Sequence, residues 1–495
     1  MPRAAFTTLG CKVNQYETQR ILDDFEARGF TITEFTEPAD IYVVNTCSVT
    51  QAAERKSRQI VRKIARQNPD AIVVMTGCYG EMARIKGEAI EEAALIVPNH
   101  QKMDTLAHVL RTFPHLAQDL PATPPEQVLR NRAVRRTRAT IKVQDGCNVF
   151  CAFCSIPYTR PYMRSRPLDE VIAEAERYAA EGYREIVVTG VLVGAYGQDG
   201  FQPQPGHALP RLPAPEPHPH QPDLPALLLR LAQVPGIERV RLSSIEPTQV
   251  TDRLIDAFAS EPRLCPHLHI PLQSGDTGVL RAMNRPYDQQ FYLERCWTAR
   301  KRIPDLAITT DIMVGFPGED RAAFENTCAV VREVGFARAH LFRYSPRPNT
   351  PAATMGNQVP DLEKEERSRA LAELCRQTQQ QFIRRFLGRT LPVLVEGRTD
   401  RISAETVDTS DNVPHTVAPS HPGALPSQTP AALLTGYTGN YIRVQFTGGS
   451  HLIGRIVPVH LIEPTSDGAI GEVGGVHAVL DDPLTVDVIP LATRE

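Results

Sequence analysis

The first part of the chain alternates between short apolar runs and amphipathic segments. Three runs of strand length stand out, at residues 5–9, 41–45 and 72–76. Segments with helical spacing separate them, at about 14–27 and 52–66. Strands that alternate with helices are typical of a parallel sheet that is covered by helices. The sequence therefore predicts an N-terminal open parallel α/β sheet over residues 1–115.

The middle of the chain repeats this alternation. Strand-like runs recur at 141–144, 186–189, 240–245, 267–272, 308–314 and 339–344. Helical patterns separate these runs, at 168–180, 226–232, 250–259, 289–301 and 321–334. Six β/α units predict a central partial (β/α)6 barrel over residues 133–370, with its site at the carboxyl ends of the strands. A stretch rich in Pro and His, 202–225, is expected to be a surface insertion.

The last part of the chain predicts a small β domain. A charged helical pattern at 361–386 leads out of the predicted barrel, and strand-like runs follow it at 391–396, 441–446 and 452–457. The run 441–446 alternates apolar with polar residues, as a half-buried strand does. We predict a C-terminal β-barrel over residues 385–465, with a Ser/Thr/Pro-rich loop at 403–430. Residues 468–495 form a tail to which the sequence assigns no role.

Composition narrows the class of protein. The length of 495 residues suits about three domains. The net charge of −3 gives no global sign of nucleic-acid binding, so that any RNA surface must be local. Neither a secretory leader nor an apolar run of membrane-spanning length is visible, which predicts a cytoplasmic protein without membrane contact. Ten cysteines in such a chain favour metal ligation or catalysis over disulfides.

Three of the cysteines lie close together after the first strand of the predicted barrel. Cys147, Cys151 and Cys154 form a C-x3-C-x2-C array, and the next His and Cys are His207 and Cys265. A structural zinc site closes with four protein ligands. Three thiolates and an open position instead fit a 4Fe–4S cluster whose fourth iron binds an external ligand. The alternatives are incidental buried cysteines or half of a split zinc site.

A second set of cysteines follows the strands of the N-terminal domain. Cys11, Cys47 and Cys78 each come within two residues of the end of a strand-like run. Because the carboxyl ends of parallel strands share one edge of a sheet, the three side chains should converge there. The alternative is that Cys47 and Cys78 are small core residues.

The sequence around these cysteines resembles a known family. The C-x3-C-x2-C array resembles the signature of radical S-adenosylmethionine (SAM) enzymes. The segments Thr-Leu-Gly-Cys-Lys-Val-Asn-Gln-Tyr-Glu at 8–17, Val-Asn-Thr-Cys-Ser-Val-Thr at 44–50 and Thr-Gly-Cys-Tyr at 76–79 resemble the N-terminal domain of radical-SAM methylthiotransferases. The C-terminal strands resemble the TRAM domain, an OB-like RNA-binding barrel.

The resemblance implies two 4Fe–4S clusters and SAM as cofactors. Cys147, Cys151 and Cys154 would hold the catalytic cluster, where one electron cleaves SAM to methionine and a 5′-deoxyadenosyl radical. Cys11, Cys47 and Cys78 would hold an auxiliary cluster that delivers sulfur, and a second SAM would methylate that sulfur. A flavodoxin- or ferredoxin-type electron donor is implied, and we expect a monomer.

Polar residues and glycines at the predicted strand ends are candidates for binding SAM. Ser243, Ser244 and Glu246 could bond its ribose or amine. The stretch from Gly315 to Glu319 resembles the adenine-side turn of the family. Thr189 and Gly190 belong to a stretch that lies near the methionine end of SAM in the family, where Leu192 replaces a residue that is usually polar. The candidates are Thr189, Gly190, Ser243, Ser244, Glu246, Gln273, Gly315 and Pro317.

The resemblance also implies RNA contacts. Guanidinium groups of a basic connector could bind phosphate. Aromatic and basic side chains of the last domain could contact bases or phosphates. The connector residues are Arg130, Arg132, Arg135, Arg136 and Arg138, and those of the last domain are Tyr437, Tyr441 and Arg443.

Motif likeness favours one substrate within the family. The segments 242–247 and 265–275 look most like the branch that acts on threonylcarbamoyladenosine in tRNA. The predicted reaction is therefore 2-methylthiolation of that base at position 37, next to the anticodon. Two enzymatic alternatives are methylthiolation of isopentenyladenosine in tRNA or of a ribosomal-protein aspartate. An alternative of another class is an Fe–S or zinc protein that binds RNA without catalysis.

Overall fold

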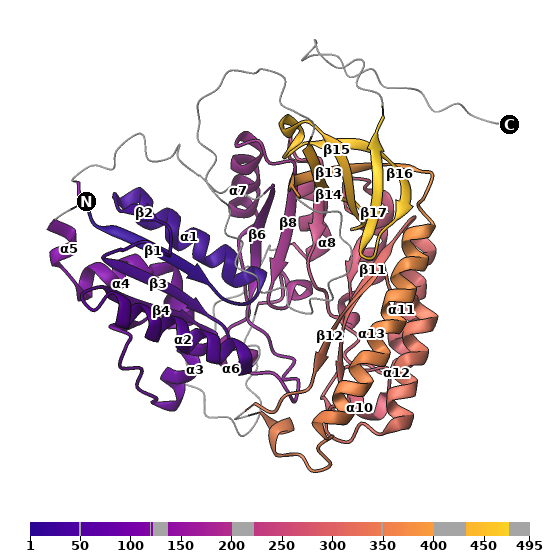
Figure 1. The fold of residues 1–495 in the computed structure, drawn as a ribbon, viewed down its shortest axis with the longest axis horizontal. Coiled ribbons are helices and arrows are strands. Elements are labelled where there is room, and N and C mark those ends of the chain that lie inside the picture. The colour runs from indigo at the N-terminus through magenta and orange to yellow at the C-terminus, as the bar shows by residue number, and fades with distance from the viewer. Residues whose placement is uncertain are drawn as a thin grey trace, which may run out of the picture.

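The computed structural model describes residues 1–48, 51–118, 120–121, 137–199, 222–347, 350–399 and 432–474. The predicted loop at 403–430, most of the insertion at 202–225 and the connector arginines before Arg138 lie outside these ranges. The N-terminal sheet lies on one side of the central strands, α11 to α13 lie on the other, and the C-terminal strands cover one end (Figure 1).

The N-terminal domain is an open parallel sheet, as predicted, with five strands where the sequence indicated three. Its order is β2-β1-β3-β4-β5. The strands are β1 (Arg3–Thr8), β2 (Thr31–Thr33), β3 (Ile41–Thr46), β4 (Ile72–Gly77) and β5 (Leu95–Ile96). The helices are α1 (Lys12–Arg28), α2 (Gln51–Gln67), α3 (Cys78–Lys86), α4 (Thr105–Thr112) and α5 (His115–Gln118).

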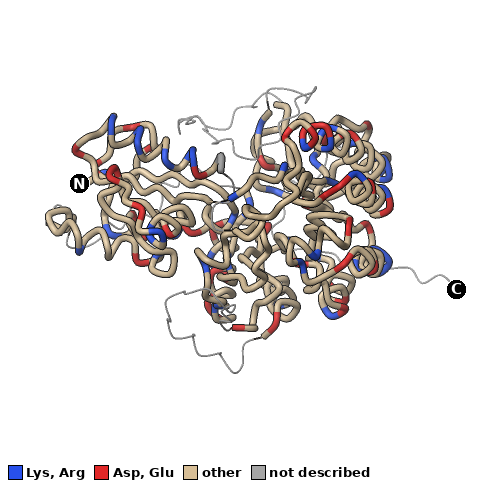
Figure 2. The backbone as a smooth tube through the Cα atoms, turned by 90° about the horizontal axis from the view of Figure 1, so that it is seen from below, with Lys and Arg blue, Asp and Glu red and all other residues tan. Residues whose placement is uncertain are grey.

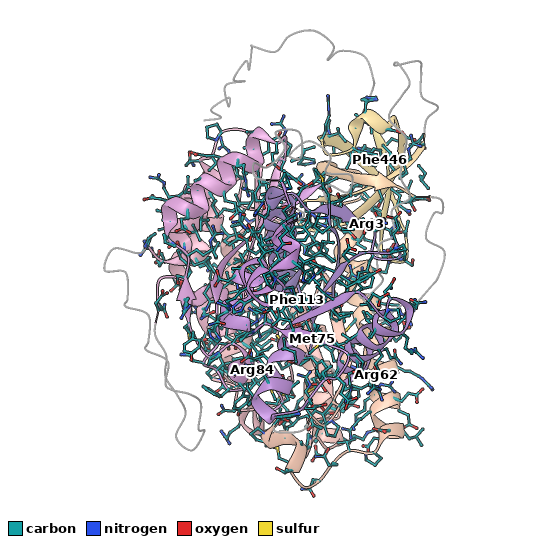
Figure 3. All side chains as sticks on the ribbon, turned by 90° about the vertical axis from the view of Figure 1, so that its left-hand side faces the viewer. Arg3, Arg62, Met75, Arg84, Phe113 and Phe446 are labelled. Atoms are coloured by element: carbon teal, nitrogen blue, oxygen red, sulfur yellow. The ribbon has the colours of Figure 1, made fainter. Side chains whose placement is uncertain are left out.

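Side chains that alternate along the strands of this sheet pack into two hydrophobic cores, one on each face. Val43 and Val74 pack on the side of α1 and α4. Met75 packs on the opposite side, against residues of α2. Figure 3 views this domain face-on and marks Met75 and, from the segment after α4, Phe113. The sheet is therefore buried on both faces, which leaves its carboxyl edge as the place for chemistry.

The central domain is a partial barrel of six parallel strands. The strands are β6 (Arg138–Asp145), β8 (Glu185–Gly190), β9 (Arg239–Leu242), β10 (His267–His269), β11 (Ala307–Val314) and β12 (Arg338–Arg343). They form two ladders, β6-β8-β9 and β10-β11-β12, that an isolated pairing of Ser244 with His269 joins. The short β7 (Arg164–Ser165) adds an antiparallel edge to β6. The predicted (β/α)6 architecture is confirmed.

Helices cover the outer face of the barrel. They are α7 (Leu168–Ala180), α8 (Leu224–Ala232), α9 (Asp252–Ser260), α11 (Gln289–Arg302) and α12 (Arg321–Val334), with the shorter α6 (Ile156–Thr159) and α10 (Thr277–Ala282) near the strand ends. Helix α8 begins inside the predicted insertion, because Asp223 caps it by accepting from the Ala226 amide. The insertion is thus shorter at this end than predicted.

The inner face of the barrel is polar. Ile308, Ile312 and Val314 of β11 belong to the apolar core with the helices. The alternate residues Thr309 and Asp311 face the other way. Side chains of the neighbouring strands that share this inner face are His267, His269, Arg338 and His340. The inner face therefore carries charged and hydrogen-bonding side chains.

The C-terminal domain is a closed five-stranded barrel in the order β13-β14-β15-β17-β16. Its strands are β13 (Thr390–Arg398), β14 (Ala432–Thr438), β15 (Arg443–Gly448), β16 (Ile456–Pro464) and β17 (Gly468–Val473). Helix α13 (Asp361–Arg384) packs along β12 of the central domain and leads into the C-terminal barrel.

Two strands of this barrel were not predicted. The predicted tail begins at Gly468, but β17 starts there and closes the barrel, so that this boundary was wrong. A Cβ atom on Gly468 would lie 2.1 Å from the carbonyl oxygen of Arg443, and one on Gly436 in β14 would lie 2.2 Å from that of Leu394. Glycine is required where these strands approach closely, although in a sequence it indicates a break.

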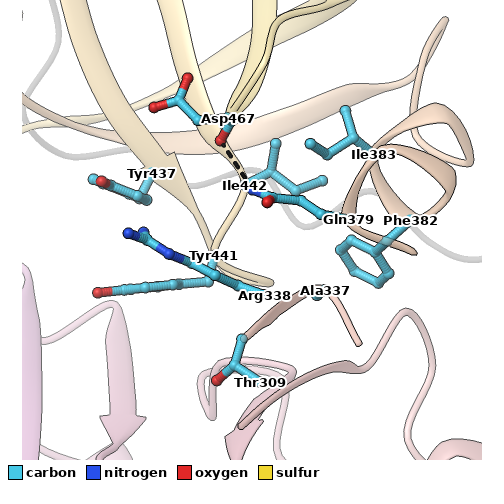
Figure 4. Close-up of a pocket in the computed structure, with 10 residues that line it drawn as sticks. All are labelled: Thr309, Ala337, Arg338, Gln379, Phe382, Ile383, Tyr437, Tyr441, Ile442 and Asp467. Carbon is cyan, nitrogen blue, oxygen red and sulfur yellow. Dashed lines mark hydrogen bonds between the residues drawn. The ribbon is translucent and has the colours of Figure 1, made fainter. Parts of the chain in front are cut away.

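Buried arginines fasten the C-terminal barrel to the central domain. Arg241 bonds Glu185 at 2.7 Å and donates to the carbonyl oxygens of Gly439 at 2.9 Å and Thr438 at 3.2 Å. The ring of Tyr441 stacks on His267 at 4.7 Å. This junction also lines a small pocket (Figure 4).

The residues predicted to contact RNA have partners inside the protein. Tyr437 and Tyr441 stack on each other at 5.0 Å, and Arg138 lies over both rings at 5.4 and 5.6 Å. Arg138 also pairs with Glu396 at 2.7 Å. These groups hold two domains together, a role that the sequence did not indicate, and their contact with RNA stays a prediction. Arg443 pairs with Asp467 at 2.6 Å.

The distribution of charge on the described chain does not indicate a particular class of protein. Basic and acidic positions are interspersed along the described chain (Figure 2). In the part of the chain that the structure describes, no helix combines the length and apolarity needed to cross a membrane.

We expect Arg241→Met to loosen the C-terminal barrel. The substitution leaves the buried Glu185 carboxylate with weaker partners, Arg239 at 3.7 Å and the charge of Arg138. Breaking a buried ion pair typically costs about 3 to 5 kcal/mol. Thermal unfolding and limited proteolysis between the domains measure the effect. The exposed Arg253, which pairs with Asp223 at 2.9 Å, is the control. If both variants unfold alike, Arg241 does not fasten the barrel.

Candidate functional site

The N-terminal cysteines lie at one edge of their sheet. Cys47 directly follows β3 and Cys78 directly follows β4. The register pairs Thr46 with Gly77, so the two cysteines occupy neighbouring positions. Cys11 follows β1 after Gly10, whose φ is 95°. The Gly10 backbone lies so close to Cys47 that a Cβ atom would be 2.5 Å from its sulfur. The predicted convergence is therefore observed.

The second set lies on the loop after β6. Gly146 opens this loop with φ 82°, and a Cβ atom there would lie 2.0 Å from the carbonyl oxygen of Tyr162. The Cys154 amide donates to the carbonyl of Cys151 at 3.0 Å, and its sulfur accepts from the Ile156 amide at 3.4 Å. Burial raises the pKa of the Cys154 thiol to about 11. A metal is the partner that converts such a buried thiol into a thiolate.

The two sets meet across the domain junction. The residues that follow Cys47 and Cys154 touch, with the Ser48 and Ser155 hydroxyls 3.3 Å apart. Among the described residues, no three His, Cys, Asp or Glu side chains are close enough to hold a single metal ion. In a 4Fe–4S cluster each cysteine binds a different iron, so its thiols stand farther apart than the ligands of one ion. The donor set of each group, three free thiols, fits a 4Fe–4S cluster with one iron open to an external ligand.

A buried carboxylate joins the two domains beside the cysteines. Glu17 of α1 is 2% exposed in its side chain and accepts from Lys102 at 2.7 Å, Lys142 at 2.6 Å and Arg160 at 2.8 Å. Burial alone would raise the pKa of Glu17, but these three cations outweigh it and hold that pKa well below its usual range. The carboxylate is therefore charged.

Arg160 extends this ion network to the second cysteine loop. Its guanidinium also pairs with Asp145 at 2.8 Å, and its carbonyl oxygen accepts from the Cys147 amide at 3.3 Å. Burial opposes ionisation of Asp145, yet Arg160 and Lys142 lower its pKa to about 2. One arginine thus contacts the N-terminal domain and the loop at once. In the sequence, Arg160 is one of three arginines, with Arg164 and Arg166, that follow the cysteine loop, and spacing alone does not reveal these contacts.

The predicted SAM-binding residues lie in different environments. Thr189 and Ser243 are buried, whereas Ser244 is exposed. Gln273 has φ 62° and bonds β11 through its backbone. Gly190, Gly315 and Pro317 occupy the ends of β8 and β11, Gly315 backs onto Lys364, and Pro317 lines an open groove of 280 Å³ with Asp276 and Asp320.

Glu246 has a partner that sequence analysis missed. Arg285 donates to its carboxylate at 2.5 Å and to the Cys151 sulfur at 2.9 Å. Burial raises the pKa of Glu246, although Arg285 opposes that change. No spacing rule connects residues so far apart in the chain, so only the fold reveals this contact.

A partial six-stranded barrel with a three-cysteine loop after its first strand defines the class of radical SAM enzymes. Residues 141–331 match the radical SAM superfamily, and residues 3–97 match a family described as Uncharacterized protein family UPF0004.

Curated relatives narrow the class. The chain is 34% identical over 472 residues to the threonylcarbamoyladenosine tRNA methylthiotransferase MtaB of Bacillus subtilis, covering 94% of each. It is 34% identical over 470 residues to the protein of that name from Chlamydia pneumoniae, covering 94% of this chain and 96% of the relative. It is also 36% identical over 398 residues to the tRNA-2-methylthio-N(6)-dimethylallyladenosine synthase of Anaplasma marginale, covering 78% and 83%.

The chain belongs to the radical-SAM methylthiotransferase family. It is therefore an enzyme of the methylthiotransferase class, which excludes the alternative of a non-catalytic RNA-binding protein. The radical SAM family uses a 4Fe–4S cluster and SAM, as predicted.

We expect Glu17→Gln to destabilise the junction of the two domains. The change leaves three buried cations without their shared carboxylate, at a cost of about 3 to 5 kcal/mol. The midpoint of thermal unfolding should fall, and the domains should become separable by limited proteolysis.

Glu92→Gln provides the matched control, because Glu92 forms an ion pair with Arg62 at 3.0 Å that is largely exposed. Such pairs contribute about 0 to 1 kcal/mol. An unchanged midpoint for Glu17→Gln would show that the network does not hold the domains.

Proposed function

We propose that this enzyme adds a 2-methylthio group to N6-threonylcarbamoyladenosine at position 37 of tRNA. The observation that carries the proposal is the 34% identity over 94% of both chains to a relative named for that reaction. The adjacency of two three-cysteine sets supports it, because sulfur insertion needs a radical source and a sulfur source at one substrate atom.

The residues divide the work between two domains. Cys147, Cys151 and Cys154 would hold the cluster that binds SAM, and Cys11, Cys47 and Cys78 would hold the auxiliary cluster. When bound, the clusters and SAM supply the radical, the sulfur and the methyl group. The chain itself orients these groups, through the Glu17 network that links α1 to the loop at Cys147. An electron donor of the flavodoxin or ferredoxin type completes the proposal.

The polarity of the barrel interior supports the choice of base. A threonylcarbamoyl group carries a carboxylate and a hydroxyl, whereas a dimethylallyl group is apolar. On the inner face, His269 pairs with Asp311 at 3.3 Å and contacts the Thr309 hydroxyl at 3.0 Å. A polar substrate group can exchange hydrogen bonds with these side chains, whereas an apolar group can make none.

A second candidate is the dimethylallyl (isopentenyl) base. The 36% identity to the Anaplasma marginale synthase favours it. No contact among the described residues favours the ribosomal-protein alternative over these two.

Nucleoside analysis of tRNA separates the two candidates. In a strain without the gene, we expect the methylthio form of threonylcarbamoyladenosine to disappear and the unmodified base to accumulate. The wild-type gene should restore it and a Cys147→Ala gene should not. The methylthio form of isopentenyladenosine should stay unchanged. Loss of that form instead would establish the second candidate, and loss of neither would refute both.

Iron content tests the two-cluster premise. We expect about eight irons in the anaerobically reconstituted protein and about four in a Cys147→Ala/Cys151→Ala/Cys154→Ala variant. The matching Cys11→Ala/Cys47→Ala/Cys78→Ala variant should also retain about four. A wild-type content of about four that falls to none in the first variant would mean that the N-terminal cysteines hold no cluster.

A further inference from the structure

The loop that carries Cys151 is held by three consecutive residues of another segment. The Met283 carbonyl accepts from the Ala152 amide at 2.9 Å. The Asn284 side chain, on a backbone with φ 57°, donates to the Phe150 carbonyl at 2.9 Å. Arg285 follows and donates to the Cys151 sulfur at 2.9 Å. The segment 283–285 therefore grips the loop through backbone and side chains together.

Each edge of the Arg285 guanidinium has a partner. Nη1 donates to Cys151, Nη2 donates to Glu246 at 2.5 Å, and Nε donates to the Tyr287 hydroxyl at 3.2 Å. The Tyr287 hydroxyl in turn donates to the carbonyl oxygens of Pro271 and Leu272 at 3.0 Å. The Arg285 side chain is 5% exposed and that of Glu246 10% exposed. The guanidinium is thus fixed in place and shielded from water.

We propose that Arg285 is a positioning residue that raises the reduction potential of the cluster on Cys147, Cys151 and Cys154, and that Glu246 holds Arg285 and moderates its charge. The inference rests on the proposed cluster ligation. A hydrogen bond to a ligating sulfur and a nearby positive charge both stabilise the reduced cluster, which carries one more electron. The effect is strong because the pair is buried, where charges are little screened. Glu246 then serves Arg285, instead of binding SAM as the sequence predicts.

The test is a redox titration followed by electron paramagnetic resonance, without SAM. The full-length protein carries Cys11→Ala/Cys47→Ala/Cys78→Ala, so that only one cluster is observed. Arg285→Gln should lower the midpoint potential, with the equilibrium constant for reduction falling about tenfold, which is about 59 mV for one electron. Glu246→Gln should raise the potential, because a negative charge is removed beside the cluster. Arg285→Lys, which keeps the charge, should lower it less than Arg285→Gln.

Arg281→Gln is the matched control, since Arg281 is exposed and lies four residues before Arg285. It should leave the potential unchanged. Potentials of Arg285→Gln and Glu246→Gln that equal the parent value, with four irons retained, overturn the inference. If Arg285→Gln loses its iron, the Glu246→Gln potential decides: a rise supports the inference and no rise overturns it. Failure of the ligation itself is recognised separately, because the triple substitution at Cys147, Cys151 and Cys154 would then not remove iron.

Discussion

The structure depends on one buried carboxylate. Glu17 projects from the first helix of the N-terminal domain and is shared by Lys102 of that domain and by Lys142 and Arg160 of the central domain. Apolar packing is tolerant of sliding, whereas a buried ion network is stable only when its partners are in place. Because Arg160 also accepts from the Cys147 amide, the arrangement of this network fixes how the two cysteine sets face each other.

The charge balance of the Glu17 network favours cysteines that are ionised, as they would be when they bind a metal. Three cations, Lys102, Lys142 and Arg160, face two carboxylates, Glu17 and Asp145, so one positive charge is left in excess. In a buried environment such a charge is costly unless an anionic group lies nearby. Thiolate ligands are anionic, and both cysteine sets adjoin this region. The network would therefore stabilise metal-bound cysteines as well as the domain junction.

Sequence patterns predicted the repeated alternation of strands and helices. They missed the contacts between residues that lie far apart in the chain. The parallel strands and the cysteines at their ends follow from apolar periodicity and from the rule that ligands gather at carboxyl ends. The strands β14 and β17 were missed because Gly436 and Gly468 allow close crossings that a pattern interprets as breaks. Tyr441 was interpreted as an RNA contact because the residue type alone does not identify the side chain on which an aromatic ring stacks. That partner, His267, lies in another domain.

Three of the contacts that the sequence did not reveal are made by buried arginines. Arg160 reaches Glu17 across 143 residues, Arg241 reaches Thr438 across 197, and Arg285 reaches Cys151 across 134. Burial lowers the pKa of the one fully buried lysine in the described part, Lys102, even though Glu17 opposes that shift. Arginine stays charged under the same conditions, and its planar group offers five donors in fixed directions. It can therefore join a carboxylate, a carbonyl and a sulfur from distant segments at one point. Each of these three contacts pairs a buried guanidinium with a carboxylate and with a further acceptor from a distant segment, whereas the sequence shows only another basic residue.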